Sequence, residues 1–166
     1  MTSPPKQLLA ALLPIIVLII IPFSIEREWH IAPNTVSLLG IPIIIAGLTL
    51  LFATASMVSS IGKGTLAPWS PTQKLVVQGP YAHARNPMIS GVLATLLGES
   101  ILFASIPIFL WFALFFVINN LYFSFSEEPG LLQRFGEEYA DYRRHVPRWI
   151  PRMKPWYPTE GTTPQD

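Results

Sequence analysis

The sequence predicts an all-α integral membrane protein with about four transmembrane helices, and three observations support that fold class. Of the 166 residues, 51% are hydrophobic and only 13% are charged, and the mean hydropathy is +0.43. Soluble globular domains carry about 25% charged residues, so this deficit indicates a chain that lies in a bilayer. Long uncharged runs also recur along the sequence. If each run crosses the membrane, nearly all basic residues fall in the segments on one side of it.

The first two spans are expected at residues 8–25 and 36–61, because neither run contains a charged residue. A helix needs about 20 apolar residues to cross the hydrocarbon core, which both runs approach or exceed. A cleaved signal peptide is the alternative for the first run. Because its apolar stretch is longer than the usual run of about 7–15 residues, and no A-x-A site follows, a transmembrane helix is favoured.

The third and fourth spans are expected at residues 88–104 and 107–125, separated only by Ser105 and Ile106. So short a connection predicts a tight antiparallel helical hairpin, and Pro107 suits the first turn of the returning helix.

The basic residues predict the orientation of these spans. Arg27 lies alone on one side of the membrane, and ten basic residues lie on the other. The ten are Lys6, Lys63, Lys74, Arg85, Arg134, Arg143, Arg144, Arg148, Arg152 and Lys154. Since cytoplasmic loops are enriched in Lys and Arg, both termini and the loop at residues 62–87 are expected in the cytoplasm.

This cytoplasmic loop contains four prolines and three glycines, so long helices or central strands are not expected in it. One interpretation is a stiff connector that Trp69 and Tyr81 anchor at the lipid interface. The other is the wall of a ligand pocket at the membrane surface. Pro87 at a helix start leaves free amides after it that suit an anion, and Arg85 can grip a carboxylate or phosphate.

Residues 126–152 after the fourth span predict an amphipathic helix along the cytoplasmic interface. Its apolar positions at helical spacing are Leu131, Leu132, Phe135, Tyr139, Tyr142 and Val146, with Arg134, Arg143 and Arg144 among the intervening residues. Glu127 and Glu128 stand where the span leaves the bilayer. Carboxylates near hydrocarbon are costly unless paired, so a cationic partner or ligand is expected there.

The composition also excludes several kinds of site. The chain has no cysteine, which rules out disulfides, thiolate metal sites and a cysteine nucleophile. Its three histidines, His30, His83 and His145, are scattered, so no metal centre is expected.

Two motifs together resemble the isoprenylcysteine carboxyl methyltransferase family, in the wider group that includes the phospholipid methyltransferases. They are GPYAHARNPM at 79–88 and, about 40 residues later, EEPGLLQRFGEEYADYRRHVPRWIPR at 127–152. The run GTLAPWSP at 64–71 is similar to a loop of the small bacterial members. The resemblance covers about residues 62–152, and the first two spans match only as hydrophobic helices.

The resemblance implies a membrane methyltransferase that uses S-adenosylmethionine, in a bacterial or archaeal cytoplasmic membrane. Residues 1–61 would then supply an N-terminal tail and two helices, 62–152 the methyltransferase core, and 153–166 a disordered tail. The implied acceptor is a lipophilic small molecule or lipid-modified molecule that arrives from the bilayer. Membrane lipids are the other expected partners, and no nucleic acid is expected.

The resemblance also nominates cofactor-binding residues. They are Gln73, Lys74, Leu75, Val76, Tyr81, Asn86, Pro87, Met88, Ile89 and Glu127, to which their chemistry adds Arg85 and Glu128. Glu127 can take the ammonium or a ribose hydroxyl of the cofactor, while Arg85 or the amides after Pro87 can take its carboxylate. No catalytic residue is assigned, and Arg85, Asn86 and Glu127 are expected to position the reactants.

Three positions depart from the family pattern. The usual Arg-His-Pro reads Arg85-Asn86-Pro87, and Ile89 replaces a tyrosine. Asn86 cannot titrate near neutral pH, so an acid–base role at that position fails for this chain. Phe123 stands where prenylcysteine-specific members carry an arginine, which argues against a prenylcysteine substrate.

Glu99 lies about a dozen residues into the third span and should face the bundle rather than lipid. It either contacts substrate or, as we favour, forms an interhelical hydrogen bond with a partner such as Asn119 or Asn120.

Two other functions stay open at the level of the sequence. One is an NADPH-dependent sterol-type membrane reductase, and the other is a non-enzymatic scaffold that binds a lipid or a protein. Cofactor binding discriminates among the three.

Overall fold

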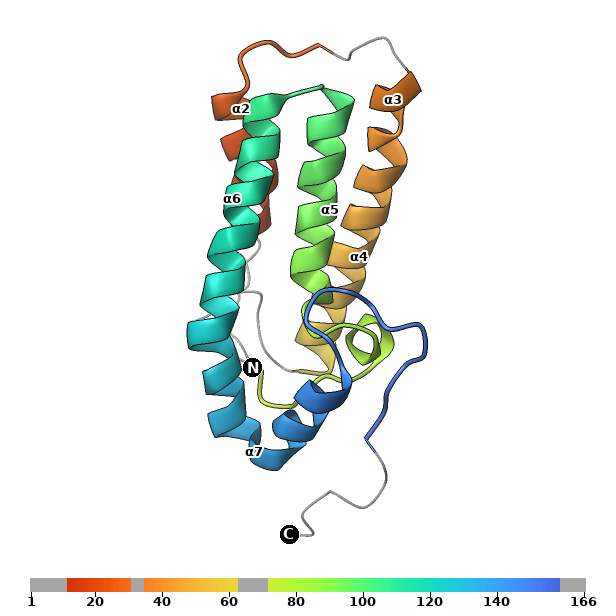
Figure 1. Ribbon diagram of the computed structural model, residues 1–166, viewed down its shortest axis with the longest axis vertical. Helices are drawn as coiled ribbons and strands as arrows, with labels where there is room; N and C mark the ends of the chain where they lie inside the picture. The colour runs from red at the N-terminus through yellow and green to blue at the C-terminus, as the bar shows by residue number, and fades with distance from the viewer. Residues whose placement is uncertain (1–11, 31–34, 63–71, 159–166) are drawn as a thin grey trace.

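The structure is a computed structural model that describes residues 12–30, 35–62 and 72–158, and within these ranges it is helical with no strand. The apolar helices run side by side along the long axis of the molecule (Figure 1). In chain order the elements are η1 (Ile16–Ile20), α2 (Ile21–Ile25), α3 (Thr35–Leu38), α4 (Gly40–Ser60), η2 (Gly79–Ala82), α5 (Pro87–Leu102), α6 (Ile106–Tyr122), η3 (Phe123–Glu127) and α7 (Glu128–His145).

Two described helices are long and apolar enough to cross a membrane, Thr35–Ser60 and Ile106–His145. Leu12–Ile25 and Pro87–Leu102 are apolar but shorter. The all-helical class is therefore confirmed for the described residues, whereas the number of four spans stays a prediction.

The closest packing in the bundle joins α4 and α5, where glycines face one another. A Cβ atom on Gly47 would lie 2.7 Å from the carbonyl oxygen of Gly91, and a Cβ on Gly91 would lie 2.8 Å from that of Gly47. Gly40 and Gly98 face each other in the same way. Small residues let the two backbones touch, which is how transmembrane helices associate where lipid offers no hydrophobic driving force.

The turn at residues 103–105 joins α5 to α6 as a tight hairpin. Ala104 adopts a φ of 49°, and Ser105 caps α6 by accepting a hydrogen bond from the Ile108 amide at 3.2 Å. Pro107 lies in the first turn of α6, as its sequence position predicts. The Ser105 hydroxyl also donates to the Glu26 carboxylate, which ties this turn to the end of α2.

The predicted hydrogen bond between Glu99 and Asn119 or Asn120 is wrong. Asn119 donates to the Phe115 carbonyl, and Asn120 accepts from Arg148 and Trp149. Among the described residues, Glu99 Oε2 is buried and has no hydrogen-bond partner. Among the described residues no hydrogen bond joins this carboxyl to either amide. Glu99 lies in the last turn of α5, near the hairpin turn, whereas Asn119 and Asn120 lie near the far end of the antiparallel α6.

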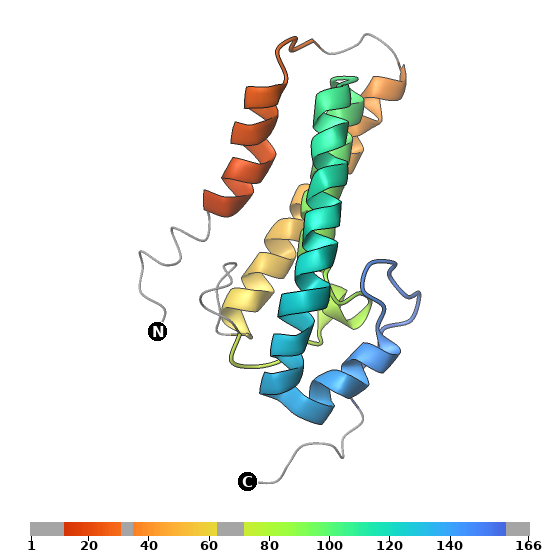
Figure 2. The ribbon, with the colours of Figure 1, turned by 60° about the vertical axis from the view of Figure 1, so that its left-hand side comes forward.

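Helix α7 continues from α6 through η3 and then bends away from the bundle axis (Figure 2). Gly136 interrupts it with a φ of 50°. The apolar face that the sequence predicts is covered by protein, because Tyr139, Tyr142 and Val146 form a core cluster with Val77 of the preceding loop. Leu132 remains exposed.

The segment at residues 146–156, here called the C-terminal strap, folds back over the loop that precedes α5. Backbone amides of Arg85 and Asn86 donate to Pro147 and Arg148, at 2.9 and 3.3 Å. In the opposite direction, the Arg152 and Trp156 amides donate to His83 and Ala82, both at 3.0 Å. The structure thus differs from the expected disordered tail at its start, since Trp156 also packs on Tyr142 and His145.

Candidate functional site

A cavity of about 560 Å³ lies between the N-terminal helix (Leu12–Ile25, which includes η1 and α2), α4, α5 and α6, at the end of the bundle near η2 and α7. Its polar wall comes from two distant parts of the chain. Tyr81, Arg85 and Asn86 precede or begin α5, while Glu127 and Arg134 follow α6. The hairpin of α5 and α6 brings these two segments to the same end of the molecule.

Most of the residues that the sequence nominates lie in this wall. They are Leu75, Val76, Tyr81, Arg85, Asn86, Met88, Ile89, Glu127 and Glu128. Gln73 and Lys74 are exposed outside the cavity, and Pro87 is buried at the start of α5 without lining it. The GTLAPWSP run at 64–71, with Trp69, lies outside the described residues.

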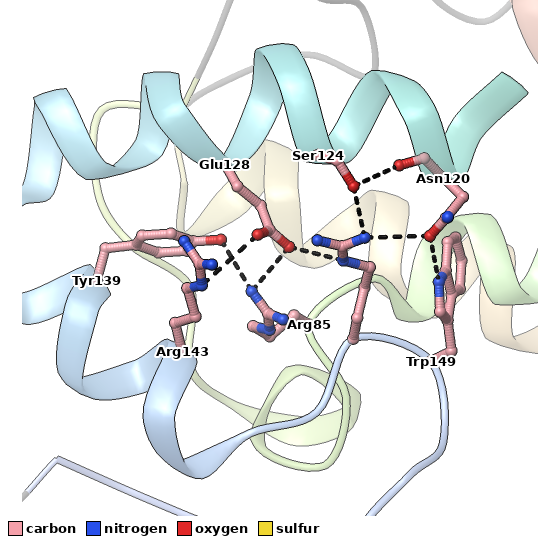
Figure 3. Close-up of polar contacts among 8 residues, drawn as sticks. Arg85, Asn120, Ser124, Glu128, Tyr139, Arg143 and Trp149 are labelled. Carbon is pink, nitrogen blue, oxygen red and sulfur yellow. Dashed lines mark hydrogen bonds and ion pairs between the residues drawn. The ribbon is translucent and has the colours of Figure 1, made fainter.

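The buried Glu128 carboxylate is held by arginines of the protein itself (Figure 3). Its Oε1 atom lies 2.8 Å from Arg85 Nη1 and 2.7 Å from Arg148 Nε. Its Oε2 atom lies 3.7 Å from Arg143 Nε, and Tyr139 adds a longer contact to Arg85 at 3.3 Å. The cationic partner expected for the acidic pair is therefore internal in the case of Glu128.

Arg148 extends this network into α6. Its Nη1 donates to Asn120 Oδ1 at 3.1 Å and to Ser124 Oγ at 2.9 Å, and Trp149 Nε1 donates to the same Asn120 oxygen. The network joins the C-terminal strap, α6, α7 and the loop before α5. We call Arg85, Glu128, Arg143 and Arg148 the arginine cluster.

Glu127 differs from its neighbour. It is half-buried and lines the cavity, and among the described residues no hydrogen bond or ion pair reaches its carboxylate. Arg134 is near enough to act on it electrostatically, but Arg134 donates its hydrogen bonds to the carbonyls of Gly130 and Thr72. The acidic pair thus divides into a carboxylate fixed inside the protein and one that faces the cavity.

The comparison with known families agrees with this arrangement. The phospholipid methyltransferase family model matches residues 35–138, more than half of the chain. The chain belongs to that family. The match confirms the resemblance seen in the motifs, and it indicates a methyltransferase that acts on a membrane lipid-type substrate. The search of curated proteins found no match.

Two buried donors of this methyltransferase lack acceptors. Arg85 and Asn86 line the cavity, and their Nε and Nδ2 atoms are buried without a hydrogen-bond partner among the described residues. The first intrahelical bond of α5 runs from the Ser90 amide to Asn86, so the amides of Met88 and Ile89 have no partner within the helix. A buried unsatisfied donor costs about 1–3 kcal/mol, so this cluster favours a ligand that brings acceptor oxygens.

Tyr81 adds a hydroxyl to the polar wall. Gly79 opens η2 with a φ of 56°, a conformation that glycine adopts at no steric cost, and the turn places Tyr81 in the cavity. Burial and then the charge of Glu127 raise the pKa of Tyr81, so its phenol stays protonated at neutral pH. The hydroxyl is therefore available as a hydrogen-bond donor beside the Glu127 carboxylate.

Farther from this end of the bundle the cavity wall becomes apolar. Leu13 and Val17 come from the N-terminal helix, Leu51 from α4, Val92 from α5 and Phe115 from α6. The N-terminal helix stands apart from α4 and α6 at its lower end (Figure 2). The cavity therefore extends from the polar wall between the apolar helices of the bundle.

Sequence reasoning missed several wall residues, including Asn119, Arg134 and Tyr139. An amide within an apolar span was the available signal for Asn119, because polar groups in spans generally face the bundle interior. Arg134 and Tyr139 were assigned only to the surface of an amphipathic helix. No sequence signal pointed to Arg148, whose role depends on the strap folding back.

Proposed function

We propose that the protein transfers a methyl group from S-adenosylmethionine to a lipophilic acceptor that reaches the site from the bilayer. The observation that carries the proposal is that three residues with unsatisfied polar groups line one cavity. Arg85 Nε and Asn86 Nδ2 are buried donors without acceptors, and Glu127 is a carboxylate without an ion pair among the described residues. A polar ligand that carries both signs of charge would satisfy all three groups.

The residues present fit this cofactor. Arg85, Asn86 and the free amides of α5 would hold its carboxylate, and Glu127 would hold its ammonium or a ribose hydroxyl. A cavity of about 560 Å³ lies within the range of small-molecule sites, roughly 300–1,000 Å³. When bound, S-adenosylmethionine supplies an electrophilic methyl group on a sulfonium centre.

The protein's own contribution would be positioning and exclusion of water rather than a covalent intermediate. Glu128 fixes one edge of the Arg85 guanidinium through Nη1, while Nε of this cavity-lining residue has no partner among the described residues. Asn86 donates without titrating, so no proton transfer is assigned to the position where relatives carry histidine.

The acceptor would occupy the apolar extension of the cavity. Phe123 is buried and lines this space where prenylcysteine-specific members carry a substrate-binding arginine. We therefore propose a lipid-like acceptor with no requirement for a prenylcysteine carboxylate. Methyl-transfer assays with a farnesylcysteine analogue and simple amphiphiles test this, and selective methylation of the prenylcysteine analogue would contradict it.

The deciding experiment is titration calorimetry of the purified protein in detergent with S-adenosylmethionine and, separately, with NADPH. Binding of S-adenosylmethionine alone is expected. Binding of NADPH alone would favour the sterol-type reductase, and binding of neither would favour a non-enzymatic scaffold. Glu138→Gln, which removes an exposed charge on α7, serves as the matched variant that should bind like the wild type.

We also propose that the cavity end of the bundle faces the cytoplasm. The turn at residues 103–105 and Glu26 lie at the opposite end from η2 and α7 (Figure 1). Reporter fusions at residue 30 and after residue 152 should report opposite sides, with the second cytoplasmic. A periplasmic C-terminus would overturn this placement.

A further inference from the structure

The C-terminal strap does not continue away from the bundle after α7. It rises from the end of α7 toward the start of α5 (Figures 1 and 2). The Trp149 ring lies 5.3 Å from the Phe116 ring and 5.7 Å from the Phe123 ring of the α6–η3 helix. Phe116 precedes Glu127 by eleven residues, about 16 Å along a helix, so Trp149 reaches back along the apolar span.

The residues next to Trp149 leave large apolar side chains uncovered. Ile150 is 80% exposed and Met153 is 94% exposed. Both belong to the strap, whose backbone is hydrogen-bonded to residues 82–86 on either side of them. They are therefore exposed on an ordered segment and not on a free chain end. Lys154 and Arg144 are exposed nearby in the chain. Apolar side chains beside exposed cations are typical of elements that lie in the interface of an anionic membrane.

Protein satisfies part of the strap's backbone, at Pro147, Arg148, Arg152 and Trp156. Irregular structure at membrane depth is tolerated only where protein satisfies its polar groups. The carbonyls of Pro147 and Arg148 accept amides from the loop before α5, and the Arg152 amide donates to His83. The Arg152 carbonyl accepts from His83 Nδ1 at 2.8 Å.

We propose that the C-terminal strap is inserted in the membrane leaflet at the cavity end of the bundle. Ile150 and Met153 contact acyl chains, and Arg144 and Lys154 bind the headgroups of anionic phospholipids. The proposal rests on the membrane placement of the bundle and not on the cofactor or the methyl acceptor, so it can fail while the proposed function stands. Because the strap's hydrogen bonds hold residues 82–86, insertion would also fix the loop that carries Arg85 and Asn86.

The absence of native cysteines makes a depth measurement direct. Single cysteines at Ile150 and Met153 would carry nitroxide labels in full-length protein, reconstituted in vesicles of phosphatidylcholine and phosphatidylglycerol. Leu114, exposed on α6, provides the lipid reference, and Glu138, exposed on α7, provides the aqueous reference. Accessibility to oxygen and to a water-soluble nickel chelate is measured at each position.

The ratio of oxygen to nickel accessibility at Ile150 and Met153 should approach that at Leu114 and exceed that at Glu138. Ratios equal to that at Glu138 would place the strap in water and overturn the proposal. Low accessibility to both reagents would mean that protein, such as a second copy of the chain, covers the two side chains, and would also overturn it. The headgroup contacts have a separate readout, since Arg144→Gln with Lys154→Gln should lower the ratio at Ile150 in anionic vesicles. An unchanged ratio in that double variant would overturn the anionic-lipid part.

Discussion

The two faces of α5 show how one helix serves both as scaffold and as wall of the cavity. On the face toward α4, Gly91 and Gly98 bring the two backbones into contact and leave no space for a methyl group. On the adjacent face, Met88 and Val92 border a cavity of about 560 Å³. The rigid seam holds the N-terminus of α5 in place, where Arg85 and Asn86, the residues proposed to bind the cofactor, border the cavity.

The largest expected effect comes from breaking the seam. In Gly47→Ala, the new methyl group would lie 2.7 Å from the Gly91 carbonyl oxygen and 2.7 Å from the Thr95 amide nitrogen, so backbone must move. We expect the free energy of unfolding in detergent to fall by about 3 kcal/mol, as in overpacked cores. The measurement is thermal unfolding of the purified variant.

Gly130→Ala is the matched control, because a Cβ there would meet nothing within 4 Å. This change should be neutral or slightly stabilising, since alanine favours helix over glycine by about 1 kcal/mol. If the two variants had equal unfolding temperatures, the α4–α5 seam would not be a rigid contact.

The next effect concerns the arginine cluster on the open side. Glu128→Gln removes a carboxylate that is 4% exposed and leaves Arg85, Arg148 and Arg143 without their shared anion. Breaking a fully buried ion pair costs about 3–5 kcal/mol, and partial exposure of Arg143 and Arg148 reduces this to about 2 kcal/mol. Thermal unfolding in detergent should therefore show a clear loss of stability without added ligand. An unchanged unfolding midpoint would mean that the arginine cluster does not stabilise the fold.

Local sequence signals predicted the helices and some of the cavity residues. Uncharged runs predicted the apolar helices, and Pro107 correctly predicted the first turn of α6, because helix starts depend on local backbone chemistry. The family motifs nominated Asn86 and Glu127, which the hairpin brings to one cavity. Motif positions do not give side-chain direction: Gln73 and Lys74 are exposed and do not line the cavity, and their cofactor contacts stay a prediction.

Other features depend on contacts between residues far apart in the chain. Arg148 reaches Asn120 only because the strap folds back along α6. Nothing in the local sequence distinguishes Glu127 from Glu128. Their different roles arise from which arginines the tertiary fold brings to each carboxylate.

A change at Glu127 tests that division through ligand affinity rather than stability. Glu127→Gln keeps the side-chain shape and removes the charge proposed to hold the cofactor ammonium. Losing a charge-assisted hydrogen bond at a partly desolvated site should weaken S-adenosylmethionine binding by about 2 kcal/mol, roughly 30-fold. Titration calorimetry measures the affinity, after thermal unfolding shows that the variant is as stable as the wild type.

Glu138→Gln is the control for this measurement, because surface charges contribute roughly 0–1 kcal/mol. Equally small losses of affinity in Glu127→Gln and Glu138→Gln would mean that Glu127 does not bind the cofactor and is only a solvated residue at a helix end. A large loss of stability in Glu127→Gln would instead mean that both members of the acidic pair support the fold.

The smallest expected effect comes from Tyr139→Phe. The lost hydroxyl accepts from Arg85 Nη1 at 3.3 Å, a long hydrogen bond, while the same nitrogen keeps its 2.8 Å contact with Glu128. Stability should fall by only about 0.5 kcal/mol, the low end for a hydrogen bond. Tyr142→Phe sharpens the comparison, since its hydroxyl donates to the Tyr81 carbonyl at 2.7 Å and its loss should cost about 1–1.5 kcal/mol. Thermal unfolding of both variants gives the order. A larger loss for Tyr139→Phe would mean that Tyr139, and not Glu128 alone, holds Arg85 at the cavity.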